Sequence, residues 1–184
     1  TLVQWSDVFG HDMVKEYLRR SLETGRIAHA YALLGPEGVG KALVAHRLAQ
    51  ALLCAHAQGG NACGSCRACR QAARRQHPDL HWIEHMGGSI GIDQVRELQR
   101  ELSLKPYEAE RKVAVIDGAD ALTQAAQNSL LKTLEEPSGQ TVILLVASNP
   151  TALLPTVHSR CQALRFQPLP AHELVRLLQE RGVP

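Results

Sequence analysis

The segment 30–55 constrains the fold most, because a buried strand, a glycine-rich turn and a helix are predicted there in direct succession. Ala30–Leu34 is a short apolar run that ends at Gly35-Pro36, which is typical of a buried strand entering a turn. Val39–Ala55 is rich in Ala and Leu and contains no Pro, which predicts a helix. The turn between them, Gly35–Lys41, fits the first seven positions of the phosphate-loop (P-loop) pattern. An α/β chain with a P-loop is therefore predicted.

Helical and apolar segments alternate along the rest of the chain. We expect helices at Asp12–Thr24, from Asp93 (as the cap) to about Leu102, at Thr123–Glu135 and at Ala171–Arg181, and strands at Leu80–Glu84, Lys112–Ile116, Thr141–Ala147 and Ala163–Phe166. Thr141–Ala147 is the most β-branched run and is predicted to be a central strand. Apolar strands that alternate with helices predict a three-layer parallel sheet with helices on both faces.

Composition excludes several classes of protein. The chain has 184 residues, of which 45% are apolar and 21% charged, so it is globular rather than disordered. The longest apolar runs are far too short to span a bilayer, so no membrane association is expected. A net charge of +2, from 20 basic and 18 acidic residues, gives no global case for a nucleic-acid coat. The nine histidines are scattered, and we expect His77, His81 and His85 at the surface.

The two ends of the chain carry further expectations. Thr1–Gly10 lacks the basic start and apolar stretch of a secretory signal, so we expect a cytoplasmic protein. Because the chain begins without Met and stops directly after a helical pattern, we expect a piece of a longer protein. Composition shifts at Pro168-Leu169-Pro170, which predicts one domain at 1–167 and the start of a second at 168–184.

The P-loop residues indicate phosphate binding without complete metal chemistry. Gly35, Gly38 and Gly40 would let backbone N–H groups turn inward around a phosphate, and Lys41 would meet its terminal oxygens. The simpler alternative is a glycine-rich turn with a surface lysine. Ala42 stands where a Ser or Thr hydroxyl normally holds magnesium, and a methyl group cannot bind that ion.

A second acidic motif is also incomplete. Asp117 ends the apolar strand Val113–Ile116 and could face magnesium. The next residue, commonly a glutamate that polarises the attacking water, is Gly118. Asp120 is expected to cap a helix rather than to replace that base. We therefore expect weak or absent binding of ATP and magnesium, and no hydrolysis.

Four of the five cysteines form a cluster. Cys54, Cys63, Cys66 and Cys69 are separated by eight, two and two residues, and four thiolates at this spacing complete a tetrahedral zinc site. One structural zinc ion is predicted; an iron–sulfur cluster or unligated thiols are the alternatives. Four nearby arginines form either a solvated face or a contact for an acidic partner: Arg67, Arg70, Arg74 and Arg75.

Several sequence pieces resemble the AAA+ subunits of bacterial clamp loaders, most closely those of the delta-prime type in DNA polymerase III. These pieces are His29-Ala30-Tyr31, the four-cysteine insert, Asn128–Pro137, Leu153–Thr156 and Ser159-Arg160-Cys161. The catalytic gamma/tau-type subunits share the insert and the Leu-Leu-Lys-Thr-Leu-Glu-Glu-Pro run. They should also carry a complete P-loop and an acidic pair, so Ala42 and Gly118 favour the delta-prime type.

The resemblance implies a three-layer AAA+ domain of the P-loop NTPase type, with a small helical lid domain beginning at 168–184. It also implies that Arg160 is an arginine finger, which acts in trans on ATP held by a neighbouring subunit, and that Asn149 is a polar sensor of the terminal phosphate. From the residues alone, Arg160 could instead pair with an acidic side chain, and Asn149 could only cap the turn before Pro150. Cys161 is expected to be a small buried hydrophobe.

The function that the resemblance implies is that of a non-hydrolysing clamp-loader subunit. Its partners would be the gamma/tau and delta subunits in a hetero-oligomeric ring, and the sliding clamp and primed DNA through the assembled complex. Two alternatives remain open: a gamma/tau-type ATPase, and a zinc-containing nucleic-acid-binding module. The last would need aromatic platforms or a basic stripe, and the chain has few aromatic residues.

Overall fold

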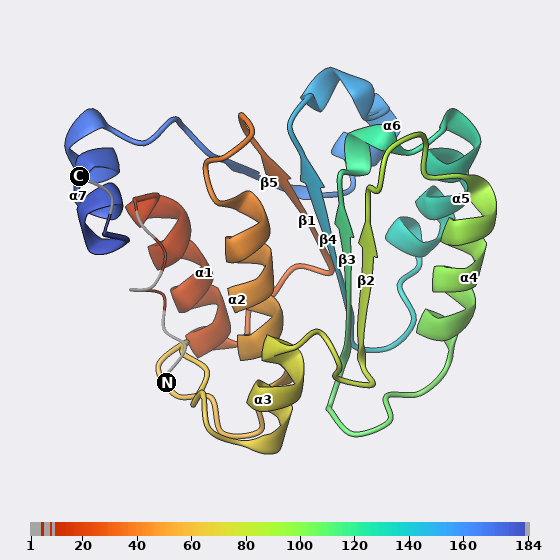
Figure 1. Cartoon of the computed structure of the whole chain (residues 1–184). Coiled ribbons are helices and arrows are strands. Elements are labelled where there is room, and N and C mark those ends of the chain that lie inside the picture. Colours follow the sequence, from red (N-terminus) through yellow and green to blue (C-terminus); the bar gives the residue numbers. More distant parts are fainter. Residues whose placement is uncertain (1–4, 6–7, 9, 183–184) are drawn as a thin grey trace.

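A five-stranded parallel sheet forms the centre of the protein. The computed structural model describes Trp5, Val8 and residues 10–182; the other positions of the Thr1–Gly10 segment and of the C-terminal end lie outside the described residues. The strands are β1 (Ala30–Leu34), β2 (Leu80–Glu84), β3 (Lys112–Asp117), β4 (Thr141–Ala147) and β5 (Gln162–Arg165), and their order is β2-β3-β4-β1-β5 (Figure 1). β4 lies at the centre, as predicted. It pairs with β1 in the register Ala32↔Leu145 and with β3 in the register Ala114↔Ile143.

Helices cover both faces of the sheet, which confirms the predicted three layers (Figure 1). One face carries α1 (Asp12–Thr24), α2 (Lys41–Leu53) and α3 (Arg67–Ala73). The other carries α4 (Ile92–Ser103), α5 (Gln124–Glu135) and the short α6 (Pro155–His158). Single 3-10 turns, η2 (Ala119–Ala121) and η3 (Pro150–Ala152), follow β3 and β4.

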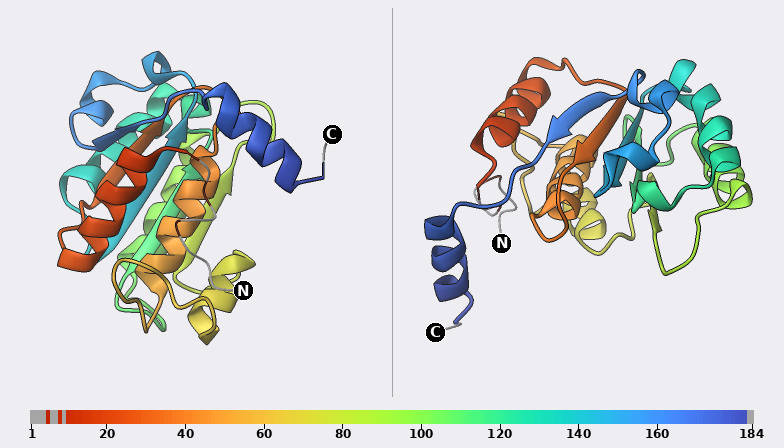
Figure 2. Two further views of the ribbon diagram at one scale, coloured as in Figure 1. Left: turned by 90° about the vertical axis from the view of Figure 1, so that its left-hand side faces the viewer. Right: turned by 90° about the horizontal axis from the view of Figure 1, so that it is seen from above.

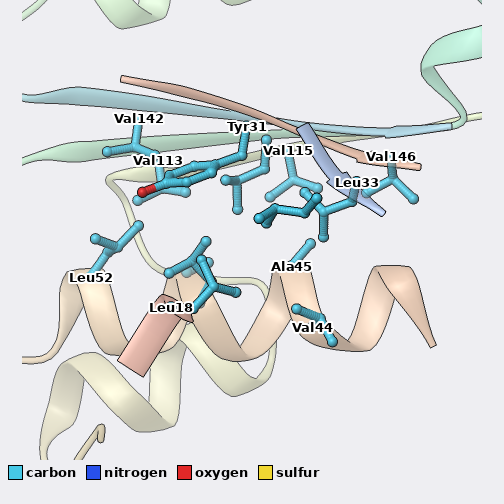
Figure 3. Close-up of a cluster of buried hydrophobic side chains, with 14 of the residues drawn as sticks. Leu18, Tyr31, Leu33, Val44, Ala45, Leu52, Val113, Val115, Val142 and Val146 are labelled. Carbon is cyan, nitrogen blue, oxygen red and sulfur yellow. The ribbon is translucent and has the colours of Figure 1, made fainter. Parts of the chain in front are cut away.

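Alternate side chains of each strand enter two separate cores. Leu33, Val113 and Val115 pack toward α1 and α2, against residues such as Leu18 and Ala45 (Figure 3). Their strand neighbours, among them Ala32, Ala114 and Ile116, pack toward α4, α5 and α6. Because both faces of the sheet are covered, the interior positions of β1, β3 and β4 are apolar, and this explains the continuous apolar runs in the sequence.

Some element boundaries and one burial prediction differ from the sequence analysis. Asp93 does not cap α4; the helix begins after Gly91, whose N–H donates to Gln94 Oε1 at 3.1 Å. α2 begins only at Lys41, because Gly40 holds a left-handed φ of 96° that ends the loop. The surface prediction was wrong for His77, which is 3% exposed and whose Nδ1 accepts the Asp79 N–H.

The last helix, α7 (Ala171–Glu180), extends away from the three layers (Figure 2). None of its residues is buried against the part of the chain that the structure describes, and Leu174, Val175 and Leu178 are exposed. It follows Pro168-Leu169-Pro170, and the domain division at that point stays a prediction. The described helices include none that is both long and apolar enough to cross a membrane.

Candidate functional site

A pocket of about 820 Å³ lies where the P-loop meets the carboxyl ends of β2, β3 and β4. Its lining comprises Glu37, Gly38, Gly40, Lys41, Ala42, Leu43, Glu84, His85, Gly88, Asp117, Gly118, Asp120, Ala121, Val146, Ser148 and Arg181. The fold thus brings together most of the predicted nucleotide-site residues: Gly38, Gly40, Lys41 and Asp117. Two predicted residues, Gly35 and Asn149, are not part of this lining.

Lys41 is bound within its own chain. Its Nζ donates to Gly35 O at 2.5 Å, to Pro36 O at 2.7 Å and to Ser148 Oγ at 3.1 Å. An ammonium group has three donors, so all of them have partners without a phosphate. Lys41 is only 6% exposed, and this burial lowers its pKa. The lysine therefore ties the loop to the end of β4 rather than presenting a free cation to the pocket.

Carboxylates outnumber cations around the pocket. Glu37, Glu84, Asp117 and Asp120 line it, against the cations Lys41 and Arg181. Burial raises the pKa of Asp117, and the nearby charge of Glu84 raises it further. A polyphosphate would therefore approach a site of net negative charge in which the Ala42 methyl stands in place of a magnesium ligand.

Gly118 is held where a side chain does not fit. Its φ is +90°, a conformation that L side chains rarely adopt, and a Cβ built on it would lie 2.5 Å from the Cβ of His85. Position 118, where such sites commonly have a water-polarising glutamate, therefore lacks a carboxylate, and His85 leaves no room there for a side chain.

Asp120 and Asn149 hold the loops after β3 and β4. Asp120 does not act as the expected helix cap; its Oδ2 accepts the backbone N–H of Asn149 at 3.2 Å. The Asn149 side chain is exposed and caps η3, because its Oδ1 accepts the N–H of Thr151 at 3.2 Å. Ser148, one residue earlier, faces the pocket instead. The sequence analysis missed Ser148, although its place directly after β4 was a usable signal.

The four cysteines of the insert meet in space as predicted. Their sulfur atoms all lie within 4.8 Å of one another, and the pairs Cys54–Cys66 and Cys63–Cys69 are each 3.9 Å apart. A tetrahedral ion with Zn–S bonds of about 2.3 Å would need sulfur atoms about 3.8 Å apart. Four sulfur donors at this separation fit zinc.

Backbone N–H groups point at the cysteine sulfurs. Cys66 N donates to Cys63 Sγ at 3.3 Å, Cys69 N to Cys66 Sγ at 3.4 Å, and Gly64 N to Cys69 Sγ at 3.3 Å. Donors of this kind favour thiolates: the pKa of Cys63 is lowered to about 6, and a hydrogen bond from the Ser65 backbone is the largest of several causes. Burial raises the pKa of Cys54 and of Cys69, so metal binding there would release protons.

Arg160 lies just after α6 and outside the pocket lining. Its Nη2 is 2.5 Å from Glu135 Oε1, and its Nη1 donates to Thr156 O at 3.0 Å. The side chain remains 34% exposed. The pairing with an acidic residue, one of the two alternatives from the sequence, is therefore present within the chain.

A buried glutamine, Gln127, connects α5 to the segment that carries Arg160. Its Nε2 donates to Ala152 O at 2.9 Å, and its Oε1 accepts the N–H of Leu154 at 2.7 Å. Gln127 is 3% exposed. The sequence analysis missed it, because the local sequence does not show that a glutamine in an amphipathic helix is buried and hydrogen-bonded to another segment.

Comparison with known proteins places the chain in a family. Residues 10–170 match the family described as "DNA polymerase III, delta subunit". The chain is 41% identical over 170 residues to DNA polymerase III subunit delta' of Bacillus subtilis, covering 92% of this chain and 51% of that protein. It is 33% identical to DNA polymerase III subunit gamma/tau of Mycobacterium tuberculosis, covering 97% of this chain and 32% of that protein. The chain therefore spans about half the length of the delta' relative and about a third of the length of the gamma/tau relative.

Solved structures agree on the fold. A variant of RuvB from Thermotoga maritima superposes with a TM-score of 0.68 at 17% identity, covering 98% of this chain and 53% of that one. This likeness supports the predicted three-layer AAA+ architecture. Together with the match over residues 10–170, it leads to one conclusion: the chain belongs to the family of DNA polymerase III delta-prime (delta') clamp-loader subunits.

Proposed function

We propose that this chain is a clamp-loader subunit that does not hydrolyse ATP and that supplies Arg160 in trans to ATP held by a neighbouring subunit. The neighbours would be gamma/tau and delta subunits in a hetero-oligomeric ring, which loads the sliding clamp onto primed DNA. The observation that carries the proposal is a separation of parts: the chain's own pocket has Ala42 and Gly118 where a magnesium ligand and a carboxylate would be needed, whereas its finger candidate lies outside that pocket.

The loss of hydrolysis follows from three features of the pocket. Ala42 removes a magnesium ligand, and Gly118 removes the water-orienting carboxylate. Lys41 is bound to two carbonyl oxygens and a serine hydroxyl of its own chain. Phosphoryl transfer depends on positioning and on charge neutralisation, so each feature alone would slow it severely.

The role of Arg160 rests on its partial exposure and on its present partner. An arginine that stabilises a transferring phosphoryl group must leave its resting contact, and an exposed ion pair such as Arg160–Glu135 contributes little to stability. A phosphate oxygen could therefore replace the carboxylate. Gln127 would keep the turn before α6 in place during this exchange.

The insert and the end of the chain have structural roles in this proposal. One zinc ion would be held by Cys54, Cys63, Cys66 and Cys69, and it would order a segment whose own buried cluster is small. Cysteines stay reduced, and so able to bind zinc, in the reducing cytoplasm that we propose as the compartment. The segment from 168 onward would begin a helical lid domain that covers the exposed apolar residues of α7.

The test is an Arg160→Ala variant of the full-length subunit, assembled with gamma/tau and delta. An arginine finger is worth about 10³–10⁵ in rate at its own site, whereas the other sites of the ring keep their fingers. We expect a partial loss of bulk ATP turnover, a larger loss of clamp loading, and unchanged assembly. The matched control is Arg165→Ala, an exposed arginine on β5, which should match wild type. Wild-type turnover and loading by Arg160→Ala would refute the finger role.

The second candidate, a gamma/tau-type ATPase, is favoured only by the 33% identity to that class. Titration of nucleotide with and without magnesium, combined with an assay of phosphate release, separates the two functions. Steady-state hydrolysis by the isolated chain that disappears in Lys41→Ala would establish the ATPase. We expect no such turnover.

A further inference from the structure

Helix α3 carries a stripe of arginines next to the cysteine cluster. Arg67 and Arg70 lie on α3 and Arg74 is its C-cap; the three are separated by three and four residues, the spacing of one helix face, and all three are exposed. We call these three residues the arginine stripe. At 1.5 Å per residue the stripe extends over about 10 Å. In Figure 1, α3 lies beside α2 on the face of the sheet away from α4 and α5.

Two hollows flank the stripe. The first, of about 360 Å³, is lined by the stripe together with Gln71 and Gln76. The second, of about 500 Å³, lies between α2 and α3; besides Arg70 and Arg74, its lining includes Arg47 and His46. Among the residues that the structure describes, no carboxylate lines either hollow. Both are therefore suited to an anion.

Carboxylates compensate little of the positive charge of this surface within the described part of the chain. In the described part of the chain, Arg70 and Arg74 form no ion pair, and Arg67 approaches Glu108 only to 3.6 Å with its side chain 73% exposed. Arg47 Nη1 donates to Gln50 Oε1 at 2.9 Å, whereas its buried Nε has no acceptor among the described groups. The guanidinium groups of Arg70 and Arg74 thus face solvent without a carboxylate partner among the described residues, and Glu108 approaches only Arg67.

The stripe is separate from the P-loop pocket and is positioned by the insert. None of its arginines lines that pocket. Cys66 caps the start of α3, because its sulfur accepts the N–H of Cys69 at 3.4 Å. Gln50 links the two elements: its Oε1 accepts a hydrogen bond from Arg47, and its Nε2 donates to the backbone oxygen of Cys69 at 3.4 Å. These hydrogen bonds therefore join the cysteine cluster to the helix that carries the stripe and to Arg47.

We propose that the arginine stripe binds the phosphate backbone of duplex DNA. Its length of about 10 Å corresponds to three base steps of about 3.4 Å each. Guanidinium groups bind phosphates through paired hydrogen bonds, and protein–DNA interfaces are polar and strongly positive. This contact is independent of the finger role of Arg160, since it needs neither ATP nor a neighbouring subunit.

The surroundings of the stripe favour a duplex over other polyanions. A protein partner usually buries an apolar centre, but the large exposed apolar residues lie on other elements, such as Met13 and Tyr17 on α1. Single strands bind on exposed aromatic platforms. The nearby Trp82 is half-buried and covered by Arg75, whose guanidinium carbon lies 3.9 Å from the ring centroid. A duplex backbone needs charge alone.

The experiment measures fluorescence anisotropy of a labelled 20-base-pair duplex with the full-length subunit alone, from 50 to 200 mM salt. The test variant is Arg70→Glu with Arg74→Glu. The matched control is Arg96→Glu with Arg165→Glu, which makes the same change in net charge at two exposed arginines elsewhere. We expect the test variant to weaken binding by about tenfold or more at 50 mM. It should also reduce the slope of log K against log salt by about two, because each phosphate contact contributes about 0.9. The control should bind more tightly than the test variant and keep the wild-type slope.

Four results would overturn the proposal: no duplex binding by the wild type at 50 mM salt, equal losses in test and control variants, a single strand bound as tightly as the duplex, or displacement by polyglutamate at equal charge. Bound metal and the melting temperature show whether a variant is folded. If the glutamate pair fails that check, Arg70→Gln with Arg74→Gln replaces it. A wild-type slope in the folded glutamine pair would equally exclude the stripe.

Discussion

His85 lies so close to Gly118 that a Cβ at position 118 would be 2.5 Å from the Cβ of His85. Both residues line the pocket, and Gly118 has a φ of +90°. Position 118 therefore lacks more than a carboxylate. A glutamate introduced there would still meet His85 and an unfavourable backbone conformation.

We therefore predict that Ala42→Ser with Gly118→Glu does not create an ATPase. The glutamate would have to adopt a strained backbone and displace His85, and strain of this kind typically costs about 1–3 kcal/mol. A lower melting temperature and no phosphate release are expected. Ala42→Ser alone serves as the control and should melt like wild type. Steady-state turnover by the double variant would contradict this steric exclusion.

Zinc content is the second prediction. Protein purified without a chelator should contain one zinc ion per chain, because four sulfur atoms within 4.8 Å of one another form a complete set of zinc ligands. Cys63→Ser should lose the metal and melt at a lower temperature, since the insert buries few residues of its own. Cys161→Ser is the matched control, because Cys161 lies outside the cluster. Metal-free wild type, or metal loss in the control, would count against the site.

Asp79 anchors the segment before β3, which leads to the third prediction. Its carboxylate is fully buried and accepts the backbone N–H groups of Tyr107 at 2.6 Å, Glu108 at 2.8 Å and Ala109 at 2.7 Å. Asp79→Asn should lower the free energy of unfolding by about 2–3 kcal/mol at pH 7, because an amide has one acceptor oxygen and no charge.

The pH dependence checks the cause of that loss. Burial alone would raise the pKa of Asp79, but the three N–H donors lower it below the ordinary 3.8. The carboxylate therefore stabilises the fold above pH 3.8, and this stabilisation disappears as pH falls through the lower folded value. The gap between wild type and Asp79→Asn should narrow in strong acid. Asp93→Asn, at an exposed position on α4, should show a smaller loss at pH 7.

Asp117 should behave in the opposite way. Burial, and then the charge of Glu84, raise its pKa above 3.8, so its ionisation destabilises the folded chain. We predict that Asp117→Asn is more stable than wild type at pH 7 and that the difference vanishes below about pH 3.8, where both states are protonated. Thermal melts across this range measure it. A less stable variant at pH 7 would indicate that the carboxylate has a cationic partner.

The sequence predicted the sheet well because the sheet is covered on both sides. Ala30–Leu34 and Thr141–Ala147 match β1 and β4 at both ends, since every residue of these runs is buried. The starts of α2 and α4 were predicted less well. Asp93 is a good capping residue by type, but the backbone of Gly91 bonds to Gln94 instead. Which residue precedes the first helical turn depends on the path of the preceding loop, and the local sequence does not determine that path.

The sequence predicted most residues of the candidate site, but not the hydrogen bonds and ion pairs that join them. The cysteine spacing and the P-loop were sufficient to place both groups of residues. The bonds of Lys41 to Ser148 and of Arg160 to Glu135 join residues 107 and 25 positions apart, and these could not be inferred from the sequence pattern. The closure of Gly118 by His85 depends on two neighbouring strand ends, which only the register of β2 and β3 brings together.

The insert is also fastened to the start of the chain, because the buried indole N–H of Trp5 donates to the carbonyl oxygen of Gly60 at 2.8 Å. This bond gives the protein a built-in optical reporter. The chain has two tryptophans, and the other, Trp82, lies on β2 beneath Arg75. In a Trp82→Phe variant the remaining emission comes from Trp5 alone, so a red shift on chelation would follow the release of Gly60 in real time. The emission of Trp5 would thus report on the state of the four sulfurs, which lie in the same insert as Gly60.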